Sequence, residues 1–259
     1  MKKILTSLFL VDYIISLFEH IGRYFDLMIK TLRSFTSWHL YMGFLPDHMI
    51  KLGIATIPIV MVIGLFSGMV TSVQIAYQLE SGFIPESYVG GIVGVTVLME
   101  LSPMITSLVM TGRVGASIAA EIGTMRVTEQ IDALETLSFD PVSFLIMPRI
   151  LSGAIMFPVM IIIADFFGIL GGYFAAVYSL GISPFDYIYG LRDWFIPWDA
   201  IFGLIKGFSF GLAITSISCY FGYYTSGGAE GVGKSTTQTV VVSCITIVIL
   251  DYVLAAILL

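Results

Sequence analysis

The chain has 259 residues, of which 57% are hydrophobic and only 12% are charged, and its mean hydropathy is +0.95. An average soluble domain has about 25% charged residues, so this composition argues against a soluble enzyme. It also excludes a disordered chain, which needs low hydrophobicity and high charge. The formal net charge of −6 argues against nucleic acid as a partner, because a protein binds nucleic acid largely by neutralising its phosphates with Lys and Arg. Residence in a membrane is the leading hypothesis.

The N-terminal segment differs from the rest of the chain. Residues 4–18 are mostly apolar, but a cleaved signal peptide would need a small-residue cleavage site, and charged residues follow instead. In residues 17–40 apolar and basic residues mix at a loose helical spacing, which predicts an amphipathic helix along the membrane surface. A helix packed on the other helices is a compatible alternative. We assign residues 1–47 to this interfacial helix region and 48–259 to a transmembrane domain.

Five intervals of the remaining chain are almost free of charged residues. They are 52–79, 87–112, 150–185, 200–229 and 235–259. Each exceeds the ~20 apolar residues that a membrane-spanning helix needs. The strands of a membrane barrel would alternate polar and apolar residues over about 10 positions, which these intervals do not do. The sequence therefore predicts an all-α integral membrane protein with five transmembrane helices.

The positions of Lys and Arg predict the orientation. If the spans alternate, residues 1–51, residues 113–149 and Lys234 lie on one side and contain ten of the twelve basic residues, whereas only Arg192 lies on the other. Cytoplasmic loops carry the excess of Lys and Arg. We therefore expect a cytoplasmic N-terminus and a C-terminus on the opposite, periplasmic side.

Neither the cysteines nor the histidines predict a metal site or a disulfide. Cys219 and Cys244 lie in apolar intervals and are expected to be small buried hydrophobic residues. The three histidines lie in the N-terminal segment without a ligand spacing. We expect no metal.

Residues 228–235 match the P-loop pattern G-x-x-x-x-G-K-[ST]. A P-loop binds phosphate because its glycine amides surround the phosphates between a buried strand and a helix. Here the preceding residues end a membrane helix. We therefore interpret the segment as a glycine-rich cytoplasmic turn with Lys234 at the membrane surface, and we expect no nucleotide or other cofactor on this chain.

Between the second and third spans, a short amphipathic helix is predicted at about 124–137. It has an apolar stripe and an acidic stripe with matching three-residue periods: Ile131, Leu134 and Leu137, and Glu129, Asp132 and Glu135. A helix resting on the bilayer is one interpretation, but such helices favour Lys and Arg. The pattern favours a helix that docks a cytoplasmic protein, with its apolar residues in a groove.

This region also resembles a known family. The segments that carry the resemblance are 100–103, 111–134, 140–141, 147–149 and 227–241. Together they are similar to the MlaE-family permeases of lipid-transporting ABC systems, over about residues 45–259. Two positions depart from the family pattern: Met99 replaces a common basic residue, and Ser102 replaces the usual glycine. They affect the charge balance expected around Glu100.

The resemblance implies an assembly as well as a fold. Permeases of this family form homodimers of five-helix subunits in the bacterial inner membrane, each with an N-terminal interfacial helix. Two ATPase subunits bind ATP and dock through the cytoplasmic coupling helix, and a ring of MCE-domain proteins lies above in the periplasm. The cavity between the two permeases holds a phospholipid or related lipid. The permease itself makes and breaks no covalent bond.

Four charged residues interrupt the predicted spans: Glu100, Asp165, Lys206 and Asp251. Charged residues in a span usually face protein or water. Because only one of these four residues is basic, we expect at most one simple ion pair among them. Glu100 precedes Pro103, where we expect a distorted helix, and it either lines the lipid cavity or makes a structural hydrogen bond. Lys206 either pairs with an acid or meets a lipid headgroup. We expect Asp165 and Asp251 to link helices.

Glycines and polar residues mark two further surfaces. Gly64 and Gly68 in the first span, and Gly203, Gly207 and Gly211 around Lys206, have the spacing of close helix contacts. At about 1.5 Å per residue, the first interval is longer than the ~30 Å hydrocarbon core. Its outer end carries the residues Thr71, Gln74, Gln78 and Leu79. By resemblance this end lines the lipid cavity; a polar seam between helices is the alternative.

Two other functions are alternatives for a membrane protein of this kind. An ion-coupled secondary transporter would use the intramembrane acids as ion sites and would be supported by inverted repeats, which the sequence does not display. A passive membrane scaffold for the ATPase would need no polar face in the first span. We expect a lipid permease.

Overall fold

The computed structural model describes residues 2–34, 42–79 and 85–259, without the side chains of 2–14, 16, 17 and 42. All regular structure in these residues is helical. The α-helices are α1 (Lys2–Arg33), α2 (Leu45–Leu52), α3 (Ile57–Leu79), α4 (Ser87–Thr96), α5 (Ser102–Met110), α6 (Ala116–Val127), α7 (Gln130–Thr136), α8 (Met147–Phe174), α9 (Pro184–Asp193), α10 (Pro197–Tyr223) and α11 (Gly228–Leu258).

The five predicted transmembrane helices are confirmed. Five helical segments are long and apolar enough to span a membrane: Leu45–Leu79, Ser87–Val127, Val142–Ser179, Pro197–Tyr223 and Gly228–Leu258. The second is longer than expected, because α4, α5 and α6 continue one another through π-helical turns η4 (Val97–Leu101) and η5 (Thr111–Gly115). Turns η6 (Val142–Ile146) and η7 (Ala175–Ser179) flank α8 in the same way.

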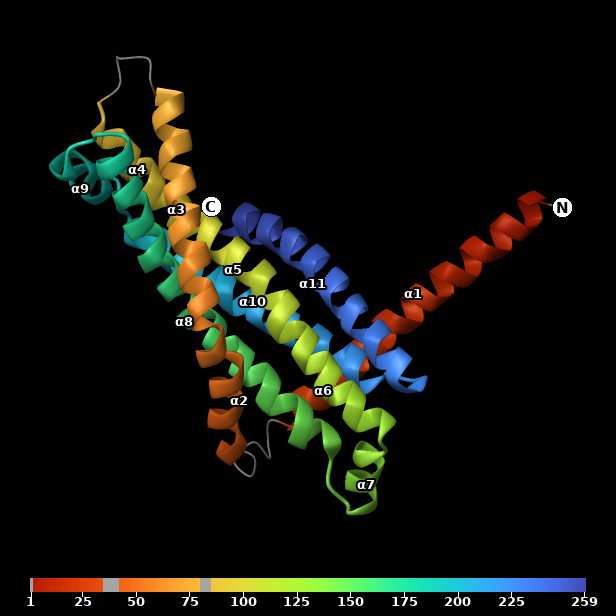
Figure 1. Ribbon diagram of the computed structural model, residues 1–259. Helices are drawn as coiled ribbons and strands as arrows, with labels where there is room; N and C mark the ends of the chain where they lie inside the picture. Colours follow the sequence, from red (N-terminus) through yellow and green to blue (C-terminus); the bar gives the residue numbers. More distant parts are fainter. Residues whose placement is uncertain (1, 35–41, 80–84) are drawn as a thin grey trace.

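The bundle has two distinct ends, here called the α7 end and the α9 end (Figure 1). The short helices α2 and α7 and the turn into α11 lie at the α7 end, whereas α9 and the outer end of α3 lie at the other. Helix α1 leaves the α7 end and projects away from the bundle. Of the segments that we predicted to share one side of the membrane, α2, the α6–α7 region and the start of α11 lie at one end of the bundle, and α1 projects from that end.

Glycines bring the spans into close contact, as their spacing predicts. Helices α3 and α8 make the most extensive contact of the bundle. A Cβ atom added at Gly68 would lie 1.8 Å from the carbonyl oxygen of Gly168, so no side chain fits there. Likewise, a Cβ atom added at Gly211 of α10 would lie 2.7 Å from the carbonyl oxygen of Gly153 in α8. Small residues at such crossings allow backbones to approach.

The helix distortion expected before Pro103 is also confirmed. The amide of Ser102 donates to the carbonyl of Val97, five residues earlier, which closes the π-helical turn η4. A proline has no amide hydrogen and its ring crowds the preceding turn, so the chain widens here instead of continuing a regular α-helix. The widened turn carries Glu100.

Helix α9 was not predicted. It packs on α4 at the α9 end, where Tyr187 is buried with Val93 and Ala176 in a small hydrophobic cluster. Ser183 caps the helix by accepting a hydrogen bond from the amide of Phe185, and Pro184 occupies its first turn. A serine followed by proline is therefore the sequence signal that could have predicted it.

The predicted interfacial helix lies within α1, which is a single helix from Lys2 to Arg33; residues 35–40 of that prediction fall outside the described residues. Among its contacts with α10 are two between polar side-chain atoms. His20 Nδ1 lies 2.7 Å from the Tyr220 hydroxyl, and the Tyr24 hydroxyl lies 2.8 Å from Ser216 Oγ. Burial raises the pKa of Tyr24 above its ordinary value, which keeps this hydroxyl protonated in its contact.

Candidate functional site

Three of the four intramembrane charges meet in one ion cluster around Lys206. Its Nζ lies 2.6 Å from Glu100 Oε2 and 2.7 Å from Asp251 Oδ1. The same ammonium lies 4.7 Å from the ring centroid of Phe202, a distance at which the cation is attracted to the ring face. The cluster therefore links the second, fourth and fifth spans: Glu100 is on η4, Lys206 on α10 and Asp251 on α11.

The expectation of at most one simple pair is wrong, because one ammonium contacts both carboxylates. The three partners differ in exposure: the side chains of Lys206, Asp251 and Glu100 are 0%, 13% and 45% exposed. Of the two alternatives for Lys206, the structure shows the pair with acids, and its burial leaves no surface for a lipid headgroup. Asp251, which we expected only to link helices, completes the cluster.

The ion cluster lies well inside the membrane. Lys206 lies nine positions after the first residue of α10 and Asp251 lies seven positions before the last residue of α11, which corresponds to about 14 Å and about 10 Å of helix. At that depth a charged group is costly unless it faces protein or a water-filled space. The partly exposed Glu100 carboxylate would therefore need water or polar groups at the surface of this chain.

The polar residues at the outer end of α3 do not all lie on one surface. Thr71 is buried, and its hydroxyl donates to the carbonyl of Ser67 at 2.8 Å. Gln74 and Gln78 are exposed and Leu79 is partly buried. Thr71 is thus bonded within its own helix, whereas the two exposed glutamines remain available to a cavity.

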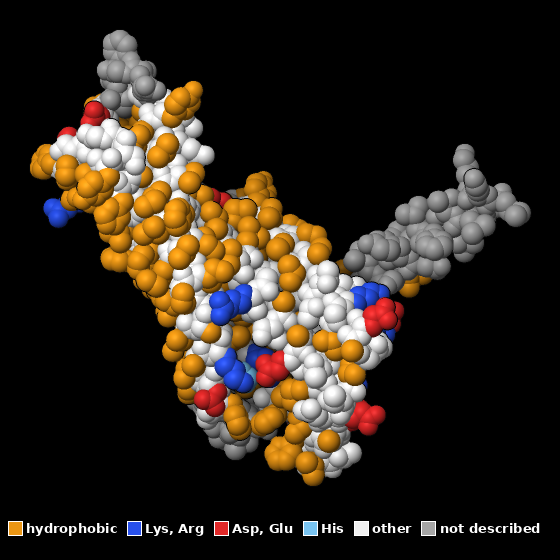
Figure 2. All heavy atoms as spheres, viewed as in Figure 1, with side chains coloured by type: hydrophobic (Ala, Val, Ile, Leu, Met, Phe, Trp, Pro, Cys, Tyr) orange, Lys and Arg blue, Asp and Glu red, His pale blue; other side chains and the backbone are white. Residues whose placement is uncertain are grey.

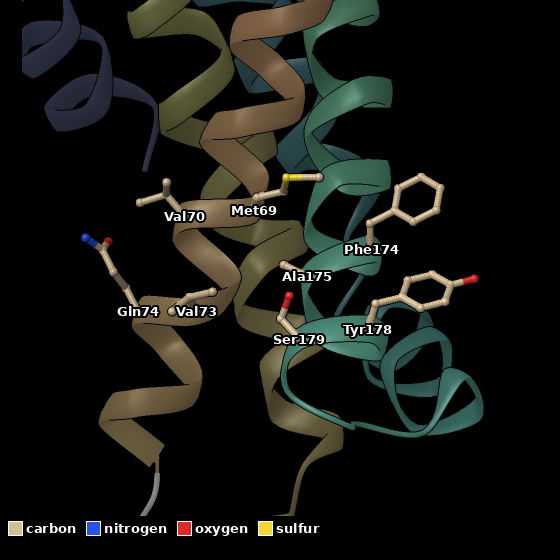
Figure 3. Close-up of a pocket in the computed structure, with 8 residues that line it drawn as sticks. All are labelled: Met69, Val70, Val73, Gln74, Phe174, Ala175, Tyr178 and Ser179. Atoms are coloured by element: carbon tan, nitrogen blue, oxygen red, sulfur yellow. The ribbon is translucent and has the colours of Figure 1, made fainter.

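Gln74 also borders a groove between α3 and α8 (Figure 3). The groove has a volume of about 480 Å³ and is mainly apolar, with Met69 and Val73 on one side and Ala175 on the other. This groove lies at the α9 end of the bundle.

The predicted coupling helix is divided in two by a sharp corner. Helix α6 ends at Val127, Glu129 adopts a left-handed conformation with φ of 59°, and α7 covers only Gln130–Thr136. Arg126 Nη1 lies 2.7 Å from Asp132 Oδ1 and so joins the two helices across the corner. One of the three predicted acids is thus paired within this chain.

The apolar stripe of α7 faces inward instead of outward, which corrects our expectation. Ile131 is fully buried in the main hydrophobic core, and Leu134 is half-buried against it. Leu137, by contrast, is 68% exposed. Helix α7 is held on the bundle by Ile131 and Leu134, two of the residues that we assigned to a partner's groove.

The outward surface of α7 carries the acids. Glu129, Asp132 and Glu135 are exposed, and two exposed apolar residues, Leu137 and Phe139, follow them. We call these five residues the acidic surface of α7. Phe139 was missed because it lies outside the three-residue period, although an aromatic residue directly before Asp140-Pro141 could have indicated a turn with an exposed ring.

The P-loop-like segment is helical. Residues 228–235 form the first two turns of α11 after Gly227, which has a positive φ of 93°. Amides within a helix donate to carbonyls one turn earlier, so most of these amides are not free to surround a phosphate. The segment is therefore the start of the last span's helix and not the cytoplasmic turn that we expected.

The surface charge follows the same division between the two ends. In Figure 2 most visible Lys, Arg, Asp and Glu side chains lie toward the α7 end, while the middle of this face is mainly hydrophobic. That is the distribution of a membrane-embedded bundle with one charged end.

Comparisons with known proteins agree with this arrangement. The sequence model of the family described as "Permease MlaE" matches residues 45–257. The chain is 40% identical over 240 residues to a probable ABC transporter permease protein of Rickettsia bellii, covering 93% of this chain and 92% of that protein. It is 32% identical over 247 residues to the intermembrane phospholipid transport system permease protein MlaE of Haemophilus influenzae, covering 95% and 94%. It is also 37% identical over 191 residues to the chloroplastic protein TRIGALACTOSYLDIACYLGLYCEROL 1 of Arabidopsis thaliana, covering 74% and 54%.

Proposed function

Because this chain belongs to the MlaE permease family, we propose that it is the membrane subunit of an ABC transporter that moves phospholipids or related lipids. In this proposal two copies form a homodimer in the bacterial inner membrane, with a cytoplasmic N-terminus and a periplasmic C-terminus. Residues 1–47 form the interfacial region and residues 48–259 the permease domain. The lipid passes between the membrane and a periplasmic MCE-domain partner.

The observation that carries the proposal is the partly exposed Glu100 carboxylate within the ion cluster. A charged carboxylate at this depth needs water or polar groups nearby, and a cavity between two protomers would supply them. The apolar surface around it would accept acyl chains, as lipid pockets are mostly apolar with few polar groups. Gln74 and Gln78 would line the outer part of the same cavity.

Energy would come from a separate ATPase that binds ATP and docks on the acidic surface of α7. Support comes from its composition, because exposed acids around two exposed apolar residues are suited to a basic partner surface with an apolar centre. Docking there would be transmitted directly to the bundle, since Ile131 anchors α7 in the core and Arg126 ties it to α6.

The alternative of an ion-coupled secondary transporter is favoured less. Its intramembrane acids would have to bind and release ions, but the carboxylates of Glu100 and Asp251 are already occupied by Lys206. A passive scaffold is favoured less as well, because it gives no role to the exposed Glu100 carboxylate.

The experiment is a lipid-transfer assay with the complete complex in proteoliposomes. Glu100→Gln keeps a hydrogen-bonding side chain of the same size but removes its charge. Hydrogen bonds to charged groups are worth ~1.5–3 kcal/mol, so we expect transfer to fall about tenfold or more while the complex still assembles. Glu86→Gln, an exposed glutamate at the α9 end, is the matched control. Unchanged transfer in Glu100→Gln would contradict the role of Glu100.

A further inference from the structure

A second group of charged side chains surrounds a recessed cavity of about 210 Å³ at the α7 end. The cavity lies between α2, the η5–α6 region and the start of α8. Its ionised lining consists of Lys51, Arg113, Arg149 and Glu121, which leaves an excess of positive charge. In Figure 2 blue and red side chains border a hollow in this part of the surface. The ion cluster around Lys206 involves none of these residues.

Arg149 is the buried residue of the cavity lining, and one of its side-chain nitrogens makes no hydrogen bond to the described residues. Its side chain is only 3% exposed; Nη1 donates to the carbonyl of Leu145 at 2.6 Å and Nη2 lies 3.1 Å from Glu121 Oε1. Its Nε has no hydrogen-bond partner among the described residues. A buried donor without a partner is unfavourable, so an acceptor that enters the cavity would remove that cost.

The three basic residues of the cavity lining each adjoin a different uncharged interval of the sequence. Lys51 directly precedes residues 52–79, Arg113 directly follows 87–112, and Arg149 directly precedes 150–185. Each therefore marks the place where the uncharged part of a span ends, inside the helical segments Leu45–Leu79, Ser87–Val127 and Val142–Ser179. We place the lipid headgroups at this level. Basic pockets between transmembrane helices at this level bind phosphate-bearing headgroups.

The cavity has the size and lining that such a group needs. One water molecule takes about 30 Å³ of liquid volume, so the cavity exceeds the space of a single water several times. The buried side chains of Val114 and Ile118 form an apolar wall beside the charged groups, which would accept the carbon atoms next to a phosphate. Arg and Lys are the side chains that pair best with phosphate oxygens.

We propose that this cavity binds a phosphate-bearing anion, supplied either by a lipid headgroup of the leaflet at the α7 end or by free inorganic phosphate. Arg149 holds the anion from inside, and Lys51 and Arg113 close over it from the more exposed side. Glu121 positions the Arg149 guanidinium and limits the affinity by its negative charge.

The test measures binding to the full-length permease in detergent by native mass spectrometry. The probes are dihexanoyl phosphatidylglycerol, inorganic phosphate and dihexanoyl glycerol, which has no phosphate. The main variant is Lys51→Ala/Arg113→Ala, which leaves the buried Arg149 in place and so preserves the fold. Its matched control is Arg192→Ala/Lys234→Ala, which removes the same number of exposed positive charges elsewhere.

We expect the main variant to bind phosphatidylglycerol at least about tenfold more weakly than the wild type, because charge-assisted hydrogen bonds to phosphate are lost. The matched control should stay within about twofold, since scattered surface charges act weakly. Glu121→Gln should bind more tightly. Binding of the phospholipid alone would identify the headgroup as the source, and parallel binding of inorganic phosphate would support a general phosphate site. Equal affinities in the wild type and main variant, an equal loss in the control, or equal binding of dihexanoyl glycerol would overturn the proposal.

Discussion

The ion cluster around Lys206 and the acidic surface of α7 use the same kinds of side chain in opposite surroundings. In the cluster, Lys206 is fully buried and two carboxylates from other spans contact its ammonium. On α7, Glu129 and Glu135 project into solvent, and the buried contact is made by Ile131. A charge in the first environment must be compensated within the chain, whereas a charge in the second remains available to a partner. The comparison separates the residues that hold the permease together from those that we propose as a docking surface.

The largest loss of stability is expected from a substitution of Lys206, the centre of the ion cluster. Lys206→Met leaves the carboxylates of Glu100 and Asp251 facing each other without a cation. Removing one partner of a buried ion pair typically costs ~3–5 kcal/mol, so we expect a marked loss of thermal stability and of folded yield in detergent. Adding Glu100→Gln and Asp251→Asn should recover much of that stability, because the uncompensated charges disappear. A wild-type melting temperature for Lys206→Met alone would argue against the cluster.

A substitution at the contact between α3 and α8 should cause the next largest loss of stability. Gly68→Ala places a methyl group against the carbonyl oxygen of Gly168, and overpacking of this kind costs ~1–3 kcal/mol. The melting temperature should fall accordingly. Gly233→Ala is the matched control, because a Cβ atom there meets no other atom within 4 Å. Equal stability of the two variants would show that the helices separate freely.

Charge reversal on α7 should affect partner binding and leave the permease intact. For Glu129→Lys/Glu135→Lys we expect the ATPase to co-purify about tenfold less well or worse, because like charges across an interface cost several kcal/mol. The stability of the permease should change by less than ~0.5 kcal/mol per site, as for most surface substitutions. Glu19→Lys/Glu230→Lys serves as the control on other exposed acids. Full retention of the ATPase by the α7 variant would place its docking surface elsewhere.

The smallest effect is expected at the P-loop-like segment. Lys234 is exposed in the second turn of α11, where a helix replaces the loop that binds phosphate. Lys234→Ala should therefore leave ATP turnover of the complex at the wild-type rate, measured as phosphate release. Complete loss of turnover would reopen the question of a nucleotide site on this chain.

Hydropathy and the spacing of residues along the sequence were sufficient to predict the spans and much of their packing. Long uncharged intervals have few alternatives to a membrane helix, and Gly64, Gly68 and Gly211 mark crossings through the absence of a side chain. Pro103 likewise indicated its distortion, because a missing amide hydrogen acts locally. Each of these signals depends on residues that are close in the sequence.

Contacts between distant residues could not be predicted in the same way. Lys206 meets Glu100 and Asp251 only because three helices cross at particular depths and rotations, which composition does not fix. The error on Ile131 has a related cause: the apolar stripe of α7 was identified correctly, but periodicity alone does not say whether a stripe faces the chain's own core or a partner. The left-handed Glu129, which turns α7 back onto the bundle, gives no signal of its own in the sequence.

The most direct test of the proposed lipid permease is native mass spectrometry of the gently solubilised complex, with lipid extraction from the same sample. The account predicts two permease chains, two ATPase chains and a co-purified phospholipid. A lone permease chain without ATPase or retained lipid would contradict it and would favour a self-sufficient secondary transporter.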